Sequence, residues 1–342
     1  MKIRAFITHK QSEHYADCQD RFAVGSDTNS VAVSDGMGST WQQKIWAELL
    51  VERYIKGNDD WKPSVDTIKP LCKEWRLRVE DSIQQLKNEN APINIINRNE
   101  RCLIEGRSAG ATFVGIRFSK SQWNGIVLGD SCLIEWDGAS ATFYTSQSTD
   151  TFDNYPDYFD SDETKSGKGI PMPIQGELTE KKLLLLVSDP FSNFLLQKSK
   201  VGTIKEYISN ILAVETHDNF ETLVMDWRSE GMPNDDSTII IIEYDKEEDF
   251  NIIQEDSITE LINKEREASI AENIQEEAID INPYHDDTAT NWNNDRNQTI
   301  RDLFLSVLTR KDRKNRGLKN RIERIVDEGI DKLLEYYSIT KK

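Results

Sequence analysis

Aspartates stand at or beside the ends of five apolar segments of this sequence, often next to a glycine or in a polar turn. An ionised carboxylate is costly to bury at the end of a hydrophobic strand unless a partner compensates its charge. Aspartate is also a common turn former beside strands, so a single member of the set says little by itself. The segments are CQDRFAV with Asp20, VAVSDGMGS with Asp35, IVLGDSCLIEW with Asp130, LLLLVSDPF with Asp189, and PNDDSTIIII with Asp235 and Asp236.

Taken together, these aspartates predict a metal centre. If neighbouring strands of paired sheets end at the same edge, the carboxylates converge, and they cannot all stay ionised unless cations lie between them. Oxygen ligands without histidine or cysteine favour Mg²⁺ or Mn²⁺ over zinc. Two such ions bind phosphate oxygens and generate a hydroxide for in-line attack. The set therefore indicates a phosphate-ester hydrolase that forms no covalent protein intermediate.

Residues 1–245 are predicted to form the single α+β domain that positions these strand ends. The segments KKLLLLVSD and STIIIIEY are apolar without alternation, which is typical of strands buried on both faces. Two strand-rich blocks, each accompanied by helices, indicate two sheets packed face to face with helices outside. Further strands are expected at 21–26, 30–35, 110–118, 123–130, 132–136 and 141–145, helices at 39–57, 64–88 and 217–231, and a long loop at 146–180. Pro70 either breaks the second helix or marks its true start.

The composition changes after Tyr244. Residues 246–298 are strongly acidic and are predicted to form one exposed helix followed by a linker. Residues 299–342 carry an excess of lysine and arginine and are predicted to form an extension of amphipathic helices. These helices either dock back on the acidic domain or pair with each other, or they bind a protein partner or self-associate between chains.

Charge and composition narrow the class of protein. A formal net charge of −18 over 342 residues argues against nucleic-acid binding and against an anionic membrane surface. The sequence shows neither a signal peptide nor a run long enough for a membrane span. The four cysteines and four histidines are scattered without zinc-ligand spacing, which favours reduced thiols in a cytoplasmic protein.

Six motifs in order resemble a known family. CQD, SDGMGS, SAGATFVG, LGDS, VSDP and NDDSTI, spread over residues 3–243, are similar to motifs of the metal-dependent type-2C (PPM-type) serine/threonine protein phosphatases. The opening H-x-x-x-C-Q-D looks like a bacterial branch of that family. The resemblance implies a four-layer αββα sandwich of two antiparallel sheets flanked by helices, with the helical extension added at the C-terminus.

The resemblance also implies a role for each matching residue. Asp35 would bridge two Mn²⁺ or Mg²⁺ ions, and the carbonyl of Gly36 would bind one of them. A hydroxide bridging the ions would attack the phosphorus of a phosphoserine or phosphothreonine. The other assignments are Asp189 and Asp235 as ligands of the second ion, Asp130 as ligand of a weakly held third ion, and Asp20 as the catalytic residue that holds metal-bound water.

The sequence departs from the family pattern at three places. The family usually has SDG where this sequence has SDP, so Pro190 replaces the glycine. Asn193 replaces an aspartate that often serves the third metal. No arginine occupies the phosphate-clamp position before Asp20, and His14 or Lys10 could substitute for it. His14 is either a phosphate contact or general acid, or an ordinary surface histidine. Met37 stands where the family often has histidine and is expected at the mouth of the site.

The leading hypothesis is a protein phosphatase that acts in signalling opposite a cognate protein kinase, with phosphoproteins as substrates. One alternative is a catalytically weak or inactive module of the same fold that binds phosphoproteins or a signalling partner. Against it, the ligand positions Asp35, Asp189 and Asp235 are all retained. A small-molecule phosphatase is a third alternative, but the acidic composition gives little support to the positively charged pocket that it would need.

Overall fold

The computed structural model describes most of the chain up to residue 279. Residues 1–271 form one compact unit. The predicted linker and the predicted basic helices over 299–342 lie outside the described residues. Within residues 1–279, the description omits 58–62, 65, 148–155, 166, 179–180 and 247.

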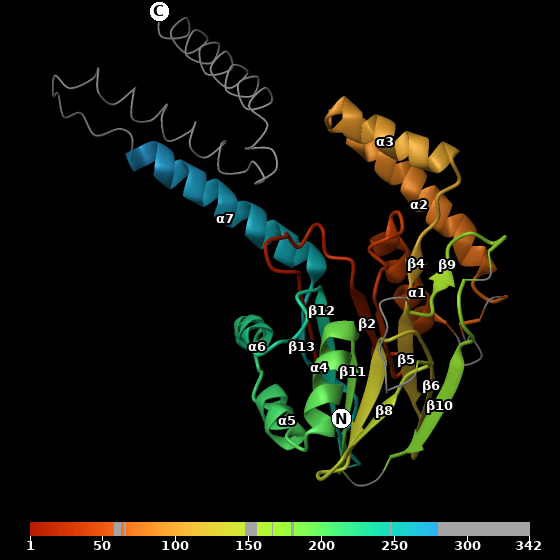
Figure 1. Ribbon diagram of the computed structural model, residues 1–342, viewed down its shortest axis with the longest axis vertical. Coiled ribbons are helices and arrows are strands. Elements are labelled where there is room, and N and C mark those ends of the chain that lie inside the picture. Colours follow the sequence, from red (N-terminus) through yellow and green to blue (C-terminus); the bar gives the residue numbers. More distant parts are fainter. Residues whose placement is uncertain are drawn as a thin grey trace, which may run out of the picture. The chain divides into compact units, whose positions relative to one another are not determined.

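The described strands form two main sheets and a two-stranded ribbon (Figure 1). All neighbouring strands are antiparallel except β1 and β13, which are parallel. The six-stranded sheet has the order β13 (Asn251–Glu255), β1 (Lys2–Thr8), β12 (Ser237–Asp245), β11 (Lys181–Val187), β7 (Cys132–Trp136) and β8 (Ala141–Tyr144). The five-stranded sheet has the order β10 (Met172–Glu177), β6 (Gln122–Leu128), β5 (Phe113–Phe118), β3 (Ser30–Ser34) and β2 (Arg21–Gly25), and the ribbon pairs β4 (Gly110–Ala111) with β9 (Phe159–Asp160).

Strands β11 and β12 are buried on both faces, as their continuous apolar sequence predicts. Leu184, Leu186 and Ile240 pack in the core between the two sheets. The alternate residues Leu185 and Ile241 pack in a second core on the other face, beneath helices. Each strand thus supplies two cores because successive side chains point to opposite faces of a sheet.

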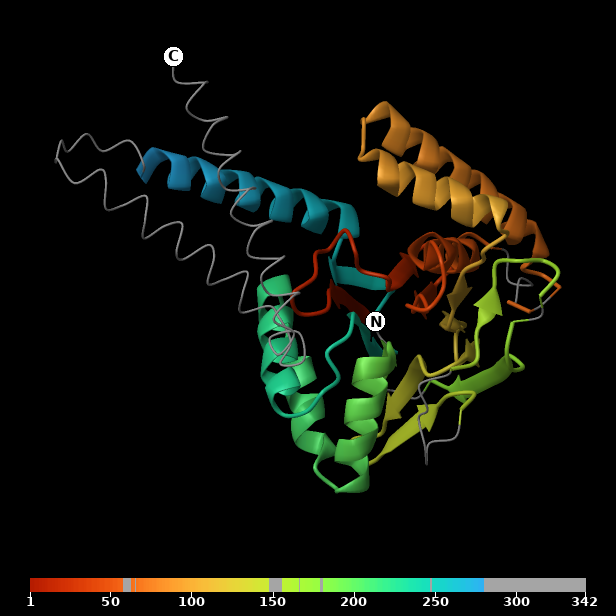
Figure 2. The same cartoon turned by 45° about the horizontal axis from the view of Figure 1, so that its top comes forward.

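Helices cover the outer face of each sheet, which confirms the predicted α+β sandwich (Figures 1 and 2). α1 packs on the five-stranded sheet, α2 packs on α1, and α3 packs on α2, while the second core joins α4, α5 and α6 to the six-stranded sheet. The helices are α1 (Gln43–Lys56), α2 (Lys69–Asn88), α3 (Ile93–Ile104), α4 (Asp189–Lys200), α5 (Ile204–Leu212), α6 (His217–Ser229) and α7 (Ile258–Ile279).

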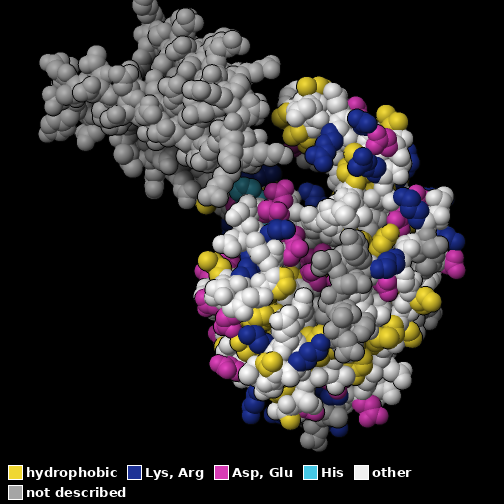
Figure 3. Space-filling view, viewed as in Figure 1, with side chains coloured by type: hydrophobic (Ala, Val, Ile, Leu, Met, Phe, Trp, Pro, Cys, Tyr) yellow, Lys and Arg dark blue, Asp and Glu magenta, His cyan; other side chains and the backbone are white. Residues whose placement is uncertain are grey.

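The structure refines several predicted boundaries. Pro70 lies in the first turn of α2, where its missing N–H is tolerated, so it marks the start of that helix. Leu77, Ile93 and Ile104 of the α2–α3 hairpin are exposed apolar side chains. Figure 3 shows hydrophobic surface over this hairpin. α3 was not predicted, and β9 and β10 lie within the segment 146–180, where a long loop was expected.

The described chain continues beyond residue 245, where the composition changes. β13 pairs with β1, and α7 begins at Ile258 within the acidic segment, where one helix was expected. The division into 1–245, 246–298 and 299–342 stays a prediction. None of the helices in the described residues is long and apolar enough to cross a membrane. All four cysteines are buried and form no disulfide.

Candidate metal centre

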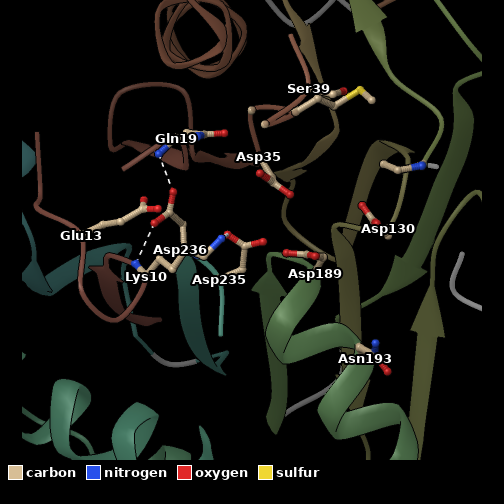
Figure 4. Close-up of a pocket in the computed structure, with 14 residues that line it drawn as sticks. Lys10, Glu13, Gln19, Asp35, Ser39, Asp130, Asp189, Asn193, Asp235 and Asp236 are labelled. Atoms are coloured by element: carbon tan, nitrogen blue, oxygen red, sulfur yellow. Dashed lines mark hydrogen bonds and ion pairs between the residues drawn. The ribbon is translucent and has the colours of Figure 1, made fainter. Parts of the chain in front are cut away.

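An acidic cavity of about 390 Å³ opens at the edge where the two sheets meet (Figure 4). Asp35 follows β3, and Asp130 follows β6 of the same sheet. From the other sheet, Asp189 follows β11 and Asp235 precedes β12. The strand ends therefore converge as the sequence analysis expected. The cavity is lined by Lys10, Glu13, Gln19, Asp35, Gly36, Met37, Gly38, Ser39, Asp130, Pro156, Asp189, Asn193, Asp235 and Asp236.

The backbone around Asp35 is fixed by the neighbouring ribbon. The carbonyl oxygen of Asp35 accepts a hydrogen bond from the N–H of Thr112 at 2.9 Å. A Cβ atom on Gly36 would lie 2.9 Å from Cγ of Gln43 and 3.0 Å from the carbonyl oxygen of Gln19. Only glycine fits such a close approach without displacing backbone. The DG pair therefore places a carboxylate and an unobstructed backbone side by side at the cavity.

Asp20 lies behind the cavity rather than on its wall. Its side chain is fully buried, and neither carboxylate oxygen makes a hydrogen bond within the described residues. Burial, followed by the charge of Asp236, raises the pKa of Asp20 to about 7, although the nearby hydroxyls of Thr238 and Ser188 oppose the shift. An unpartnered buried carboxylate needs a compensating positive charge or a proton.

The carboxylates on the wall repel one another. Burial, and then the charges of Asp20, Asp189 and Asp130, raise the pKa of Asp35 well above its usual range. Burial and the charges of Asp130 and Asp20 do the same for Asp189. Such a cluster of oxygen donors matches the ligand chemistry of Mg²⁺ or Mn²⁺. The residues present therefore fit divalent cations.

The donors are spread around the cavity instead of gathered at one point. Within the described residues, no group of three or more His, Cys, Asp and Glu side chains is arranged to hold a single metal ion. Each ion would therefore take few side chains and complete its coordination with water and backbone oxygen. Mg²⁺ usually keeps several water ligands in proteins.

Asp236 has a role that the sequence analysis did not assign. Its Oδ1 accepts from the N–H of Lys10 at 2.9 Å, and its Oδ2 accepts from the N–H of Gln19 at 2.6 Å (Figure 4). One carboxylate thus holds both ends of the loop 9–20 that joins β1 to β2. The two adjacent aspartates of NDDS could have drawn attention to Asp236 in the sequence. Its partners, the backbone N–H groups of Lys10 and Gln19, are known only from the structure.

Lys10 is the only lysine or arginine among the described residues that line this cavity. Its Nζ lies 3.8 Å from Oδ1 of Asp235. A lysine here can donate to phosphate oxygens as a point charge. Of the two substitutes considered for the missing arginine, Lys10 is the one that the structure brings to the cavity.

His14 is not among the residues that line the cavity. Its side chain is 70% exposed, and its Nδ1 lies 2.8 Å from Oε1 of Glu265. The hydrogen bond and the charge of Glu265 raise the pKa of His14. Of the two interpretations left open for His14, this placement agrees with the surface histidine: the side chain contacts α7 and lies outside the cavity where a phosphate contact or general acid was expected.

The departures from the family pattern have simple structural settings. Pro190 lies in the first turn of α4, directly after Asp189, where proline is well tolerated. Asn193 lines the cavity, and its Oδ1 accepts from Nε2 of Gln197 at 2.9 Å. Met37 also lines the cavity, as expected for its mouth. Pro190 therefore leaves the backbone at Asp189 helical and does not displace the carboxylate from the wall.

The chain belongs to the protein phosphatase 2C family, since the model of that family matches residues 9–223. This match confirms the resemblance found in the sequence motifs. Three solved structures are similar to this chain. A bacterial serine phosphatase is 15% identical, with 70% of this chain and 96% of that chain covered and a TM-score of 0.46. The serine/threonine phosphatase Stp1 from Staphylococcus aureus is 14% identical, with coverages of 70% and 93% and a TM-score of 0.45.

The third is the catalytic domain of the serine/threonine phosphatase PstP in complex with two manganese ions. It is 16% identical, with 70% of this chain and 96% of that chain covered and a TM-score of 0.41. A comparison with curated proteins found no match.

Proposed function

We propose that this protein is a Mn²⁺- or Mg²⁺-dependent phosphatase that hydrolyses phosphoserine or phosphothreonine in proteins, opposite a cognate protein kinase. The observation that carries the proposal is the convergence of Asp35, Asp130, Asp189 and Asp235 from both sheets on one cavity, with Asp20 buried behind it. Family membership supports the same activity.

The proposed roles of the residues are those that the family resemblance implies, and the lining of the cavity is compatible with them. Asp35 and the carbonyl of Gly36 would hold one ion, and Asp189 and Asp235 the other. Asp35 would join the second ion only once the side chains close around it, since no three of them gather at one point among the described residues. Asp130 would hold a third, and Asp20 would accept hydrogen bonds from water in the cavity. Bound divalent cations supply an acidified water nucleophile and offset the negative charge of the phosphate. Without them, the acidic wall repels a phosphate dianion.

Release of phosphate from a phosphothreonine peptide tests the proposal directly. The rate should depend on added Mn²⁺ and fall to background with EDTA, because the cavity alone is too negative to bind phosphate. If the folded protein binds Mn²⁺ but releases no phosphate, the proposal is wrong. A module that binds phosphoproteins without turnover would then take its place, as the dispersed arrangement of the donors favours.

Replacing Lys10 with alanine should raise KM for the phosphopeptide about tenfold and change kcat much less. A charged hydrogen bond contributes about 1.5–3 kcal/mol, and about 1.4 kcal/mol corresponds to a tenfold change in binding. Steady-state kinetics would measure both constants. The matched control is Lys205→Ala on α5, since Lys205 is exposed and lies outside the lining of the cavity. An unchanged KM in Lys10→Ala would remove Lys10 from phosphate binding.

A further inference from the structure

The loop 9–20 forms part of the cavity wall. It supplies Lys10, Glu13 and Gln19 to the lining. Asp236 holds its two ends through backbone N–H groups. The middle of the loop, at residues 14 and 15, is five or six residues from the ends and lies too far along the chain for Asp236 to fix. Its position must therefore come from other elements, among them α1, where Nζ of Lys44 donates to the carbonyl oxygen of Ala16 at 3.0 Å.

α7 is another of these elements. Oε2 of Glu265 accepts from the backbone N–H of Tyr15 at 3.0 Å, and Oε1 lies 2.8 Å from Nδ1 of His14. The side chain of Glu265 is 26% exposed, so this contact is partly shielded from water. Figures 1 and 2 both show the loop lying against the first turns of α7. One carboxylate of α7 thus holds two successive residues at the middle of the loop.

Apolar packing reinforces this contact. Leu261 is 6% exposed and packs in a small core with Ile7, Tyr15 and Cys18. One turn further along α7, Glu265 lies on the same face of the helix, since residues four apart are neighbours. The face that α7 presents to the loop therefore combines an apolar anchor with a hydrogen-bond acceptor.

The start of α7 is itself fixed to the sandwich. Oδ2 of Asp256 accepts from the N–H of Ile7 at 3.0 Å and lies 2.7 Å from Nδ1 of His217. Asp256 thus anchors the helix to β1 and α6 before it reaches the loop. α6 also holds the loop directly, since the hydroxyl of Tyr15 donates to Oε1 of Glu221 at 2.6 Å and lies 2.8 Å from Nε2 of His217.

We propose that Glu265 is a positioning residue for catalysis, through which α7 holds the loop 9–20 and keeps Lys10 and Glu13 at the cavity. α7 lies beyond the 9–223 segment that matches the family, so the working catalytic unit includes part of the acidic segment. The inference rests on the proposed function, because turnover is one of its two readouts.

The test compares Glu265→Ala and Glu265→Gln in the full chain. The control is Glu267→Ala, which makes the same charge change on an exposed side chain of the same helix. Hydrogen exchange of the Tyr15 amide and steady-state kinetics on a phosphothreonine peptide are measured for each. In Glu265→Ala, exchange should accelerate and kcat/KM should fall, each about tenfold, because one hydrogen bond to a charged acceptor is lost.

The remaining variants separate positioning from general damage. Glu265→Gln keeps an acceptor oxygen, so its kcat/KM should stay within about threefold of the value for the unmodified protein. The control Glu267→Ala should have the same kcat/KM as the unmodified protein. Fast exchange with unchanged turnover in Glu265→Ala would overturn the positioning role, as would unchanged exchange. If the unmodified protein shows no turnover, the proposed function fails, whereas the exchange of the Tyr15 amide still decides whether Glu265 holds the loop.

Discussion

Replacing Asp35 with asparagine is expected to reduce the hydrolysis of a phosphothreonine peptide at least about a hundredfold, with the protein still folded. Changes in groups that merely support metal ligands already cost about 10–100-fold, and Asp35 would contact the ions itself. Asparagine keeps the size of the side chain but removes the charge that would bind both ions. Phosphate release at saturating Mn²⁺ measures the loss, and calorimetric titration with Mn²⁺ shows whether metal affinity falls with it.

Asp27→Asn is the matched control, since Asp27 is exposed in the turn between β2 and β3. It should turn over peptide at the rate of the unmodified protein. Asp35→Asn should also unfold at a higher temperature than the unmodified protein in EDTA, because it removes a half-buried charge that the neighbouring aspartates repel. Full activity in Asp35→Asn would refute the assignment of Asp35 as a metal ligand.

The second large effect is a dependence of folding stability on pH that bound metal should remove. Without metal, stability should fall as pH rises from about 4 to about 7. The pKa of Asp20 is about 7 in the fold, whereas an unperturbed aspartate has a pKa of about 3.9. The folded state then binds more protons than the unfolded state in this window, so deprotonation favours unfolding. The raised pKa values of Asp35 and Asp189 act in the same direction.

Mn²⁺ should reverse this loss by replacing the missing protons. Its effect on the midpoint of thermal unfolding should be small at pH 5 and at least about 5 °C at pH 7.5. Thermal unfolding with Mn²⁺ or EDTA at both pH values measures the difference. In Asp35→Asn, the midpoint of thermal unfolding should depend less on pH and less on Mn²⁺ than in the unmodified protein. Equal stabilisation by Mn²⁺ at the two pH values would show that these carboxylates do not bind the ion.

The sequence was most informative where a local pattern meets a general rule of sheet geometry. β11 and β12 were predictable because an unbroken apolar run supplies side chains to both faces of a buried strand. The convergence of Asp35 and Asp189 was predictable because strand ends meet at a sheet edge. Both features can be predicted from short segments, because each depends only on the pattern of apolar residues and on where the pattern ends.

Contacts between distant segments were not predictable in this way. Asp236 meets Lys10 and Gln19 across more than 200 positions, and Glu265 meets Tyr15 across 250. Nothing in the residues around Glu265 distinguishes it from the other acids of its segment. The sequence could not decide between the two interpretations of His14 for the same reason, because its partner on α7 lies equally far along the chain.

The burial of the cysteines bears on how the protein would respond to oxidants. Cys18 and Cys132 are fully buried, and burial raises the pKa of both thiols, so neither offers the reactive thiolate that peroxide attacks. Cys72 and Cys102 are also buried. The described residues that line the cavity supply oxygen donors and no thiol. The activity proposed for it should therefore be insensitive to mild peroxide treatment, which oxidises accessible thiolates.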